Sequence, residues 1–426
     1  MIVRRLAGVA AAVALAWSVV PAASGQAPQR PSLEGADAAI LVDAGDGTPI
    51  LEKEPTQRRS IASTTKLMTA LLTLERAPLD AVYAAADYQA APAESKIDLR
   101  PGERMRVSDL LEALMLESAN DAAATLAEGV SGSREAFVAE MNARAGELGL
   151  EDTSYANPIG LDDPQNYSSA RDLATLARRL LRDRRFARIV DSPSATLESG
   201  AEPRVVGNRN DLIASVPAVD GIKTGYTSEA GYVLVGSATG SNGAQVVSVV
   251  LGEPSEAARD ADTLALLRYG LAQYRRVPLL RKGRAVARAD VAHHDETVAL
   301  VPRRALAVTA RRDQRLEQRV RAPEELAGEI AAGTPVGTVV VRRDGEVVER
   351  VALLTAKRVP GAGPLRRVVA SLGPPLTALA LLVIVSVTGA VGMQMRRRHR
   401  HRRAATRRRE RERVRARDQQ DPAGKP

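Results

Sequence analysis

An uncharged stretch near the C-terminus, from Val368 to Met395, constrains this chain more than any other feature. Its last 20 residues, Leu376 to Met395, would span about 30 Å as a helix, the thickness of a hydrocarbon core. A run of arginines follows immediately. Because such runs stay on the cytoplasmic side of a membrane, the sequence predicts one spanning helix at 376–395, a cytoplasmic tail at 396–426 and an extracytoplasmic body.

The N-terminus indicates export in the same orientation. Arg4 and Arg5 precede an apolar run from Leu6 to Val20 and a group of small residues, which is the pattern of a secretory signal. We therefore predict a signal peptide over residues 1–25 and a polar spacer over residues 26–36. An uncleaved anchor is the alternative, but the apolar run is short for a spanning helix.

The net charge of +9 belongs to the tail. Residues 396–426 contain 13 arginines and one lysine against four acidic side chains, which leaves the other 395 residues close to neutral. We expect this tail to be disordered and to contact anionic lipid. We do not expect nucleic acid as a partner.

Two scarce residue types exclude whole classes of chemistry. The chain has no cysteine, so disulfides, thiolate catalysis and cysteine-held metals are excluded. All four histidines lie C-terminal to residue 292. A Ser-His-Asp triad and a histidine-held zinc are therefore unavailable in residues 1–292, where a general base must be Lys, Asp, Glu or Tyr. We expect neither a metal nor a cofactor.

Residues 37–276 show an α+β pattern, with strands at both ends and helices between. A hairpin is expected from Ala38 to Glu52, with its turn at Asp46-Gly47. Period-two apolar runs predict further strands around 220–225, 233–238 and 245–251, followed by a covering helix at 256–274. The spacing of apolar residues predicts the remaining helices at 64–75, 107–116, 121–128, 134–148 and 170–182.

The composition changes at Val277. From there to Arg358 the apolar runs are short and rich in valine, and Asp344-Gly345 between two of them predicts a hairpin. We predict a small all-β domain over 277–358 and a linker over 359–375. His293 and His294 are interpreted as surface residues, because no further metal ligand lies nearby in the sequence.

Three short stretches of the larger domain carry polar groups suited to act together. The first is Ser63-Thr-Thr-Lys66, at the start of an expected helix. Lys66 follows Ser63 by three residues and therefore lies one turn away on the same face. Ser63 is equally suited to cap this helix, and Ser-x-x-Lys alone occurs often by chance.

The other two stretches are Ser118-Ala-Asn120 and Lys223-Thr224-Gly225. The first breaks an apolar helical pattern and places two polar side chains on a short loop. The second lies in an expected strand. Because its glycine has no side chain, an extended peptide could bind beside this strand and form hydrogen bonds with its backbone. The first stretch could equally be an ordinary inter-helix turn, and the second could be the end of a hairpin.

Together these groups permit nucleophilic catalysis without histidine. Ser63 at a helix start would lie near the positive end of the helix dipole, which favours developing negative charge. Apolar neighbours and the second cation, Lys223, would lower the pKa of Lys66, so that a neutral amine could take the serine proton. The remaining side chains could relay a proton, hold a substrate amide and receive a terminal carboxylate: Ser118, Asn120 and Thr224, respectively.

The three motifs, in this order, resemble those of the penicillin-recognising serine enzymes. Their contexts are similar to the low-molecular-mass penicillin-binding proteins that are D-alanyl-D-alanine carboxypeptidases. The resemblance covers about 38–274, is weaker over the β-domain, and implies a β-lactamase/transpeptidase-like fold. The matching stretches are Ser60-Ile-Ala-Ser-Thr-Thr-Lys-Leu-Met-Thr69, Glu117-Ser-Ala-Asn-Asp121, Gly160-Leu-Asp with Tyr167-Ser-Ser-Ala-Arg-Asp172, and Asn208-Arg-Asn210 leading into Asp220-Gly-Ile-Lys-Thr-Gly225.

This resemblance implies an acyl-enzyme reaction on peptidoglycan stem peptides ending in D-Ala-D-Ala, and acylation by β-lactam antibiotics. Carried onto this chain, Ser63 is the nucleophile and Lys66 the base. The proton and hydrogen-bond network would be formed by Ser118, Asn120 and Lys223.

The resemblance also implies how the substrate is held. Backbone N–H groups of Ser63 and Tyr226 would form the oxyanion hole, Gly225 would line the same strand, and Thr224 with Arg209 would meet the carboxylate. Tyr226 stands where some relatives have His, a difference expected to bear on deacylation or substrate preference. A second departure, an alanine at position 119 where many relatives have glycine, is expected to be harmless.

Three alternatives remain open. A class A-like β-lactamase needs a deacylating glutamate in Glu-x-x-Leu-Asn, and the nearest match, at 147–151, ends in Glu151 instead of Asn. A D,D-endopeptidase attacks the same acyl centre, so sequence does not separate it from a carboxypeptidase. A catalytically silent cell-wall binding protein is disfavoured because every chemical group is present.

Overall fold

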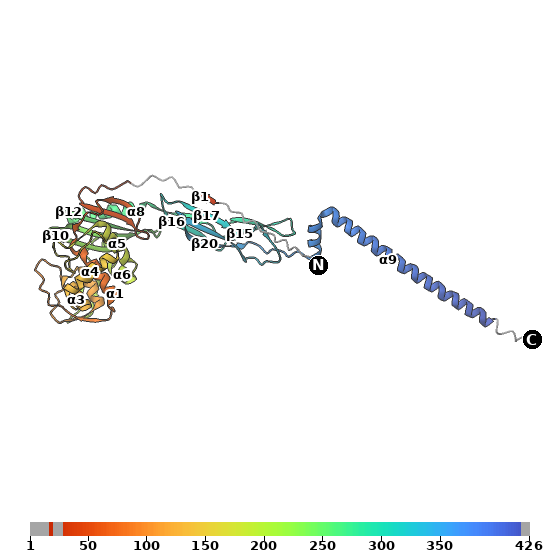
Figure 1. Ribbon diagram of the computed structural model, residues 1–426, viewed down its shortest axis with the longest axis horizontal. Coiled ribbons are helices and arrows are strands. Elements are labelled where there is room, and N and C mark those ends of the chain that lie inside the picture. Colours follow the sequence, from red (N-terminus) through yellow and green to blue (C-terminus); the bar gives the residue numbers. More distant parts are fainter. Residues whose placement is uncertain (1–16, 20–28, 419–426) are drawn as a thin grey trace, which may run out of the picture. The chain divides into compact units, whose positions relative to one another are not determined.

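The computed structural model describes residues 17–19 and 29–418, so most of the predicted signal peptide lies outside the described residues. The chain forms two compact units (Figure 1). The larger runs to Leu279 and includes Ala307–Leu316, and the smaller is formed by Leu280–Leu306 and the chain from Glu317 onward. Residues 307–316, which were predicted to lie in the small β-domain, group with the larger unit because β16 (Leu306–Arg311) pairs with β13 (Tyr274–Leu280).

A five-stranded sheet forms the centre of the larger unit. Its order is β10 (Val219–Thr227), β11 (Gly231–Thr239), β12 (Gln245–Glu253), β2 (Ala38–Asp43) and β3 (Pro49–Lys53), and all of its neighbouring strands are antiparallel. The N-terminal hairpin thus joins strands that lie about 200 residues later, which confirms the predicted α+β class. β10 lies at one edge of this sheet, so its outer side is free to face the site.

The two faces of the sheet are covered by different helices (Figure 1). On β12, Val246 and Val250 pack with Leu266 of α8 (Glu256–Ala272), whereas Val247 and Val249 belong to the core on the opposite face. This alternation follows from the period of two in a strand. Burying such side chains contributes roughly 1.5–3 kcal/mol each.

The core on the second face contains α5 (Ala170–Leu181) and the predicted helical cluster. Ser169 caps α5 by accepting a hydrogen bond from the Asp172 N–H at 3.2 Å. Apolar residues recur at 173, 176, 177 and 180 and are buried, which is the spacing of one helix face. The other helices of this cluster are α1 (Lys66–Arg76), α2 (Val107–Glu112), α3 (Asn120–Ser131), α4 (Arg134–Glu147) and α6 (Arg184–Val190).

Short strand pairs and turns connect these elements and hold the loops of the site. The pairs are β4 (Arg59–Ser60) with β7 (Tyr167–Ser168), β5 (Val82–Ala84) with β6 (Arg104–Arg106), and β8 (Ser194–Leu197) with β9 (Arg204–Gly207). A one-turn helix, α7 (Leu212–Ser215), precedes β10.

The smaller unit contains a seven-stranded sheet. Its order is β1 (Trp17–Val19), β17 (Leu316–Arg321), β19 (Pro335–Arg343), β20 (Glu346–Thr355), β15 (Thr297–Pro302), β14 (Ala287–Val291) and β18 (Glu325–Leu326). Asp344 and Gly345 both have positive φ, 50° and 87°, as the predicted two-residue hairpin requires. The three residues of β1 lie in the segment predicted to be a signal peptide.

The C-terminal helix α9 runs from Pro364 to Asp418. Its segment Pro375–Arg413 contains an 18-residue window with a mean hydropathy of 2.3, and it is the one helix of the described chain that is long and apolar enough to cross a membrane. Over residues 396–418 the tail is helical and not disordered as expected, since α9 continues through the arginine run. No Gly or Pro interrupts residues 396–418, and Arg and Ala are good helix formers.

Candidate active site

Ser63 lies in a tight turn against which two glycines pack closely. The turn is the 3₁₀ helix η1 (Ala62–Thr65), which precedes α1. A Cβ on Gly160 would lie 2.0 Å from the carbonyl oxygen of Ala62, and a Cβ on Gly225 would lie 2.9 Å from Ser63 N. The absence of a side chain at Gly225 therefore allows η1 to approach β10 closely.

Lys66 is fully buried and surrounded by three oxygen atoms. Its Nζ lies 3.0 Å from Ser63 Oγ, 2.7 Å from Asn120 Oδ1 and 2.6 Å from the carbonyl oxygen of Ile159. A neutral amine has two N–H groups and one lone pair. When the two carbonyl oxygens accept the two N–H groups, the lone pair is directed at the Ser63 hydroxyl. With Lys66 neutral, Ser63 would donate its proton to this lone pair, and no side-chain hydrogen bond from Ser63 caps the helix.

The surroundings of Lys66 favour the neutral amine. Burial, followed by the charge of Lys223, lowers the pKa of Lys66 well below its ordinary value. Arg209 lowers this pKa further, whereas the carboxylates of Glu94 and Asp121 oppose the shift. Burial and the second cation thus lower this pKa as the sequence predicted, while the role of Lys66 as the base stays a prediction.

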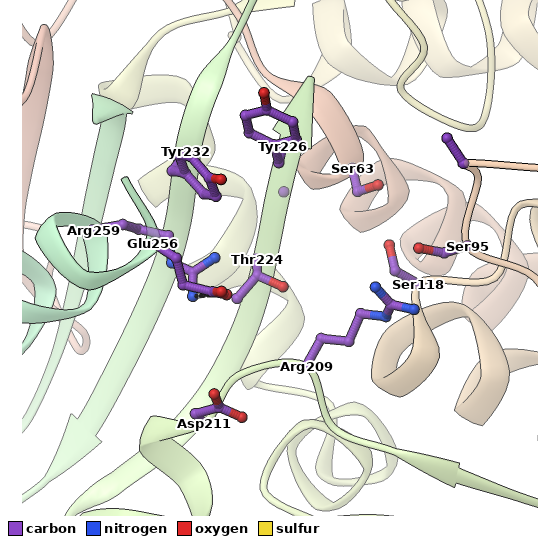
Figure 2. A pocket seen from close by; sticks show the side chains of 12 residues that line it. Ser63, Ser95, Ser118, Arg209, Asp211, Thr224, Tyr226, Tyr232, Glu256 and Arg259 are labelled. Atoms are coloured by element: carbon purple, nitrogen blue, oxygen red, sulfur yellow. Dashed lines mark hydrogen bonds and ion pairs between the residues drawn. The ribbon is translucent and has the colours of Figure 1, made fainter. Parts of the chain in front are cut away.

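The second motif occupies a break between helices, as expected. α2 passes into a turn of π-helix over Ala113–Glu117, Ser118 takes a left-handed conformation with φ 62°, and α3 begins at Asn120. Ser118 Oγ is buried and neither donates nor accepts a hydrogen bond within the described residues. This hydroxyl points into the cavity (Figure 2).

Lys223 and Thr224 lie on the edge strand β10 and are buried. Lys223 Nζ donates to the carbonyl oxygen of Thr224 at 3.1 Å. Burial, together with the nearby guanidinium groups of Arg209 and Arg259, lowers the pKa of Lys223 to about 7. The side chain of Lys223 therefore changes charge close to neutral pH.

An open cavity of about 430 Å³ lies between these groups. Figure 2 shows Ser63, Ser95 and Ser118 on its helical side, with Thr224 on β10 facing them. Its lining consists of Ser63, Ala93, Ser95, Ser118, Arg209, Asp211, Thr224, Gly225, Tyr226, Tyr232, Glu256 and Arg259. We call Ser63, Lys66, Asn120 and Ile159 the helical wall, and Lys223, Thr224, Gly225 and Tyr226 the strand wall.

Arg209 lines the cavity but is already paired. Its guanidinium lies 2.5 Å and 3.0 Å from Glu117 Oε1, and half of its side chain is exposed. Tyr226 is 57% exposed, and its ring lies 4.4 Å from that of Tyr232. The structure thus brings every predicted site residue to one place, although Arg209 shares its charge with a carboxylate.

Several groups of the site were not predicted. Arg259 of α8 is 3% exposed, pairs with Glu256 and Asp260, and lines the cavity beside the strand wall. The carbonyl oxygen of Ile159 and the carboxylate of Glu94 complete the surroundings of Lys66 and Asn120. Among the described residues, no group of three or more His, Cys, Asp or Glu side chains is placed to hold a metal ion.

A serine bonded to a buried lysine, with a second buried lysine on the edge strand of an α+β unit, defines the class of penicillin-recognising serine hydrolases. Residues 24–255 match the family model of D-alanyl-D-alanine carboxypeptidase, Peptidase_S11, and residues 274–361 match the C-terminal domain of penicillin-binding protein 5. The chain belongs to the D-alanyl-D-alanine carboxypeptidase family, which confirms the resemblance seen in the sequence.

Similar proteins cover most of the chain. D-alanyl-D-alanine carboxypeptidase DacF of Bacillus subtilis is 31% identical over 77% of this chain and 87% of its own length. DacA of Haemophilus influenzae is 31% identical over 84% and 94%, respectively. The crystal structure of penicillin-binding protein 5 from Haemophilus influenzae matches with a TM-score of 0.56 and 30% identity, covering 78% of this chain and all of its own. The Streptomyces K15 DD-transpeptidase matches with a TM-score of 0.55 and 32% identity, covering 57% of this chain and all of its own.

Proposed function

We propose that this protein is a serine carboxypeptidase that removes the terminal D-Ala from peptidoglycan stem peptides ending in D-Ala-D-Ala. The observation that supports this most strongly is the position of Lys66 Nζ within hydrogen-bond distance of Ser63 Oγ and of two carbonyl oxygens, so that the neutral amine would direct its lone pair at Ser63, which lines an open cavity beside an edge strand. An extended peptide laid along β10 would present its carbonyl to Ser63.

The reaction proceeds in two steps. Neutral Lys66 takes the proton of Ser63, and Oγ attacks the carbonyl carbon of the penultimate D-Ala to form a tetrahedral intermediate. The C–N bond then breaks, and the departing D-Ala amine receives a proton relayed from Lys66 through Ser118. Water afterwards hydrolyses the acyl-enzyme and restores Ser63. In a β-lactam the amide bond of the ring takes the place of the peptide bond that is cleaved. Ser63 attacks its carbonyl carbon and is acylated by the same first step.

The residues of the strand wall would bind the substrate. The N–H groups of Ser63 and Tyr226 would stabilise the oxyanion, since Gly225 brings η1 and β10 together. Thr224, Lys223 and the guanidinium groups that lower its pKa, Arg209 and Arg259, would attract the terminal carboxylate.

The test uses the full-length chain and a pentapeptide substrate. We expect mass spectrometry to show loss of one D-Ala, unaffected by EDTA, and no loss with Ser63→Ala. Fluorescent penicillin should label the wild type at Ser63 and release slowly. Rapid turnover of penicillin would support the β-lactamase alternative, and absence of labelling would support a silent binding protein.

Transfer of the acyl group to an amine is the second candidate. It is favoured by the match to a Streptomyces protein described as a DD-transpeptidase. Hydrolysis of a cross-link, the endopeptidase reaction, attacks the same acyl centre. Adding a cross-linked peptide or an amine acceptor to the assay distinguishes these outcomes by the mass of the product.

We further propose a single-pass membrane protein whose residues 376–395 span the bilayer. The exposed apolar side chains of α9 support this, as does the arginine run that follows them. The active site would be extracytoplasmic, and the tail would contact anionic lipid. Protease added outside intact spheroplasts should destroy the larger unit, and survival of that unit would reverse the orientation.

A further inference from the structure

We propose that Glu94 is a positioning residue that holds the amide of Asn120 with its carbonyl oxygen toward Lys66. Glu94 lies in the connection between β5 and β6, outside all three sequence motifs. The inference rests on the proposed function, because it concerns how Lys66 becomes a directed base.

The contacts of Asn120 define its amide orientation. Asn120 Nδ2 donates to Glu94 Oε2 at 2.6 Å, and Oδ1 accepts from Lys66 Nζ at 2.7 Å. The two ends of an amide are nearly the same size, so only their partners decide which way it points. An ionised carboxylate accepts hydrogen bonds and donates none, and Glu94 therefore selects the NH₂ end.

Glu94 is itself held in place. The Tyr88 hydroxyl donates to Oε2, and the Ala91 N–H donates to Oε1 at 3.0 Å. Partial burial raises the pKa of Glu94, but these hydrogen bonds and that of Asn120 outweigh burial and leave the pKa below its ordinary value. The guanidinium of Arg134 lies 5.9 Å from the centre of the Tyr88 ring.

The segment that carries Glu94 is also fixed to α3. The Asn120 N–H donates to the carbonyl oxygen of Ser95 at 2.8 Å. The Asp121 carboxylate accepts from the N–H groups of Ile97 and Leu99. The carboxylate at position 94 is thus anchored to the helix whose first side chain it orients.

Two consequences follow for Lys66. If the amide of Asn120 were reversed, its NH₂ group would face Nζ and compete with Ser63 for the lone pair. The negative charge of Glu94 also raises the pKa of Lys66. Asp121 acts in the same direction, while Lys223 and Arg209 act in the opposite one. Glu94 therefore affects both the direction and the proton affinity of the base.

The experiment measures the acylation rate of the full-length chain in detergent with fluorescent penicillin, over the pH range in which the fold is intact. Glu94→Ala removes both the acceptor and the charge, whereas Glu94→Gln removes the charge and keeps an acceptor oxygen. Asp87→Ala is the matched control, since this carboxylate lies in the same connection, is exposed and accepts a hydrogen bond from Gln89 at 2.7 Å.

When the acylation rate is plotted against pH, it should reach a plateau at high pH. We expect this plateau rate to be lower by about tenfold or more in Glu94→Ala, which is the scale of one lost hydrogen bond to a charged group. Glu94→Gln should keep the plateau within about threefold. Both variants should shift the acid limb of the profile toward lower pH, because both remove the charge that raises the proton affinity of Lys66. Asp87→Ala should change neither quantity.

A plateau in Glu94→Ala equal to that of the wild type would overturn the proposal, as would an unshifted acid limb in both variants. The second outcome would remain decisive if Glu94→Ala lost its melting transition, because Glu94→Gln preserves the shape of the side chain. Failure of the proposed function looks different: the wild type itself would not be acylated at Ser63.

Discussion

The helical wall and the strand wall each contain a buried lysine, and the two lysines differ in what surrounds their amines. Both Lys66 and Lys223 are at most 1% exposed, and both have lowered pKa values. Three oxygens surround Lys66 Nζ, whereas the only hydrogen bond from Lys223 Nζ within the described residues goes to Thr224 O. Burial makes both amines able to lose a proton, but only directed acceptors aim the lone pair of a neutral amine at the nucleophile.

This contrast assigns different tasks to the two walls. The helical wall would carry proton transfer, since its lysine is bonded to the nucleophile. The strand wall would carry charge and binding, since its lysine lies beside two guanidinium groups and changes protonation near pH 7. Substitutions that separate rate from affinity test this division.

The largest expected effect is that of removing the base. Lys66→Ala and Lys66→Arg should both lower the acylation rate by on the order of 10³-fold, because the first has no proton acceptor and a guanidinium keeps its proton. Stopped-flow labelling with penicillin measures the rate. Lys282→Ala, an exposed lysine of the smaller unit, is the control. If Lys66→Arg kept more than a tenth of the wild-type acylation rate, proton transfer could not be assigned to the helical wall.

The second effect concerns how closely the two walls approach. A Cβ at position 225 would lie 2.9 Å from Ser63 N and 3.1 Å from Ala62 Cβ, so Gly225→Ala must push η1 away from β10. We expect the acylation rate to fall by about 10² while the fold persists, since small displacements of a reacting group carry that cost. Gly207→Ala, which has no atom within 4 Å of its new Cβ, should leave the rate unchanged.

The sequence predicted those parts of the molecule that depend on local spacing. Alternation along 233–238 and 245–251 located two sheet strands, and the three motifs located most residues of the two walls. Ile159 was not predictable because it acts through a backbone carbonyl, which every residue has. Glu94 gave no signal because its segment has no regular period and its partner, Asn120, lies 26 residues away.

Arg259 shows a different limit. Glu256 and Arg259 stand three residues apart on α8, a spacing that brings both side chains to one helix face, where they form an ion pair. The sequence did not indicate that this face borders the cavity, because that depends on how α8 packs against β11 and β12. The same holds for residues 307–316, whose place in the larger unit depends on pairing between β13 and β16.

The third prediction separates the two lysines by pH. Lys223 is charged below about pH 7 and neutral above it, so attraction for a terminal carboxylate is lost as pH rises through about 7. We expect the KM of a D-Ala-D-Ala peptide to rise several-fold from about pH 6 to about pH 8. The inhibition constant of the same peptide with a C-terminal amide should not follow this rise. An equal rise for both peptides would show that the strand wall does not sense the carboxylate.

The smallest expected effect concerns stability. Because the pKa of Lys223 is lowered on folding, the folded state binds fewer protons than the unfolded state between about pH 7 and about pH 10, and stability rises with pH there. Lys223→Met removes this cost together with a single hydrogen bond, and should stabilise the larger unit by about 1 kcal/mol, roughly 2–4 °C in Tm. The gain should shrink as pH approaches 10, where the wild type no longer carries the cost.

Lys66→Met is the matched variant and should behave in the opposite way. It leaves Asn120 Oδ1 and the carbonyl oxygen of Ile159 buried without their donor, at a cost of roughly 1–3 kcal/mol for each unsatisfied group. We therefore expect its Tm to fall while that of Lys223→Met rises, as measured by thermal unfolding in the same buffer. If both substitutions raised Tm equally, the oxygens around Lys66 would contribute nothing beyond burial, and the two lysines would be electrostatically equivalent.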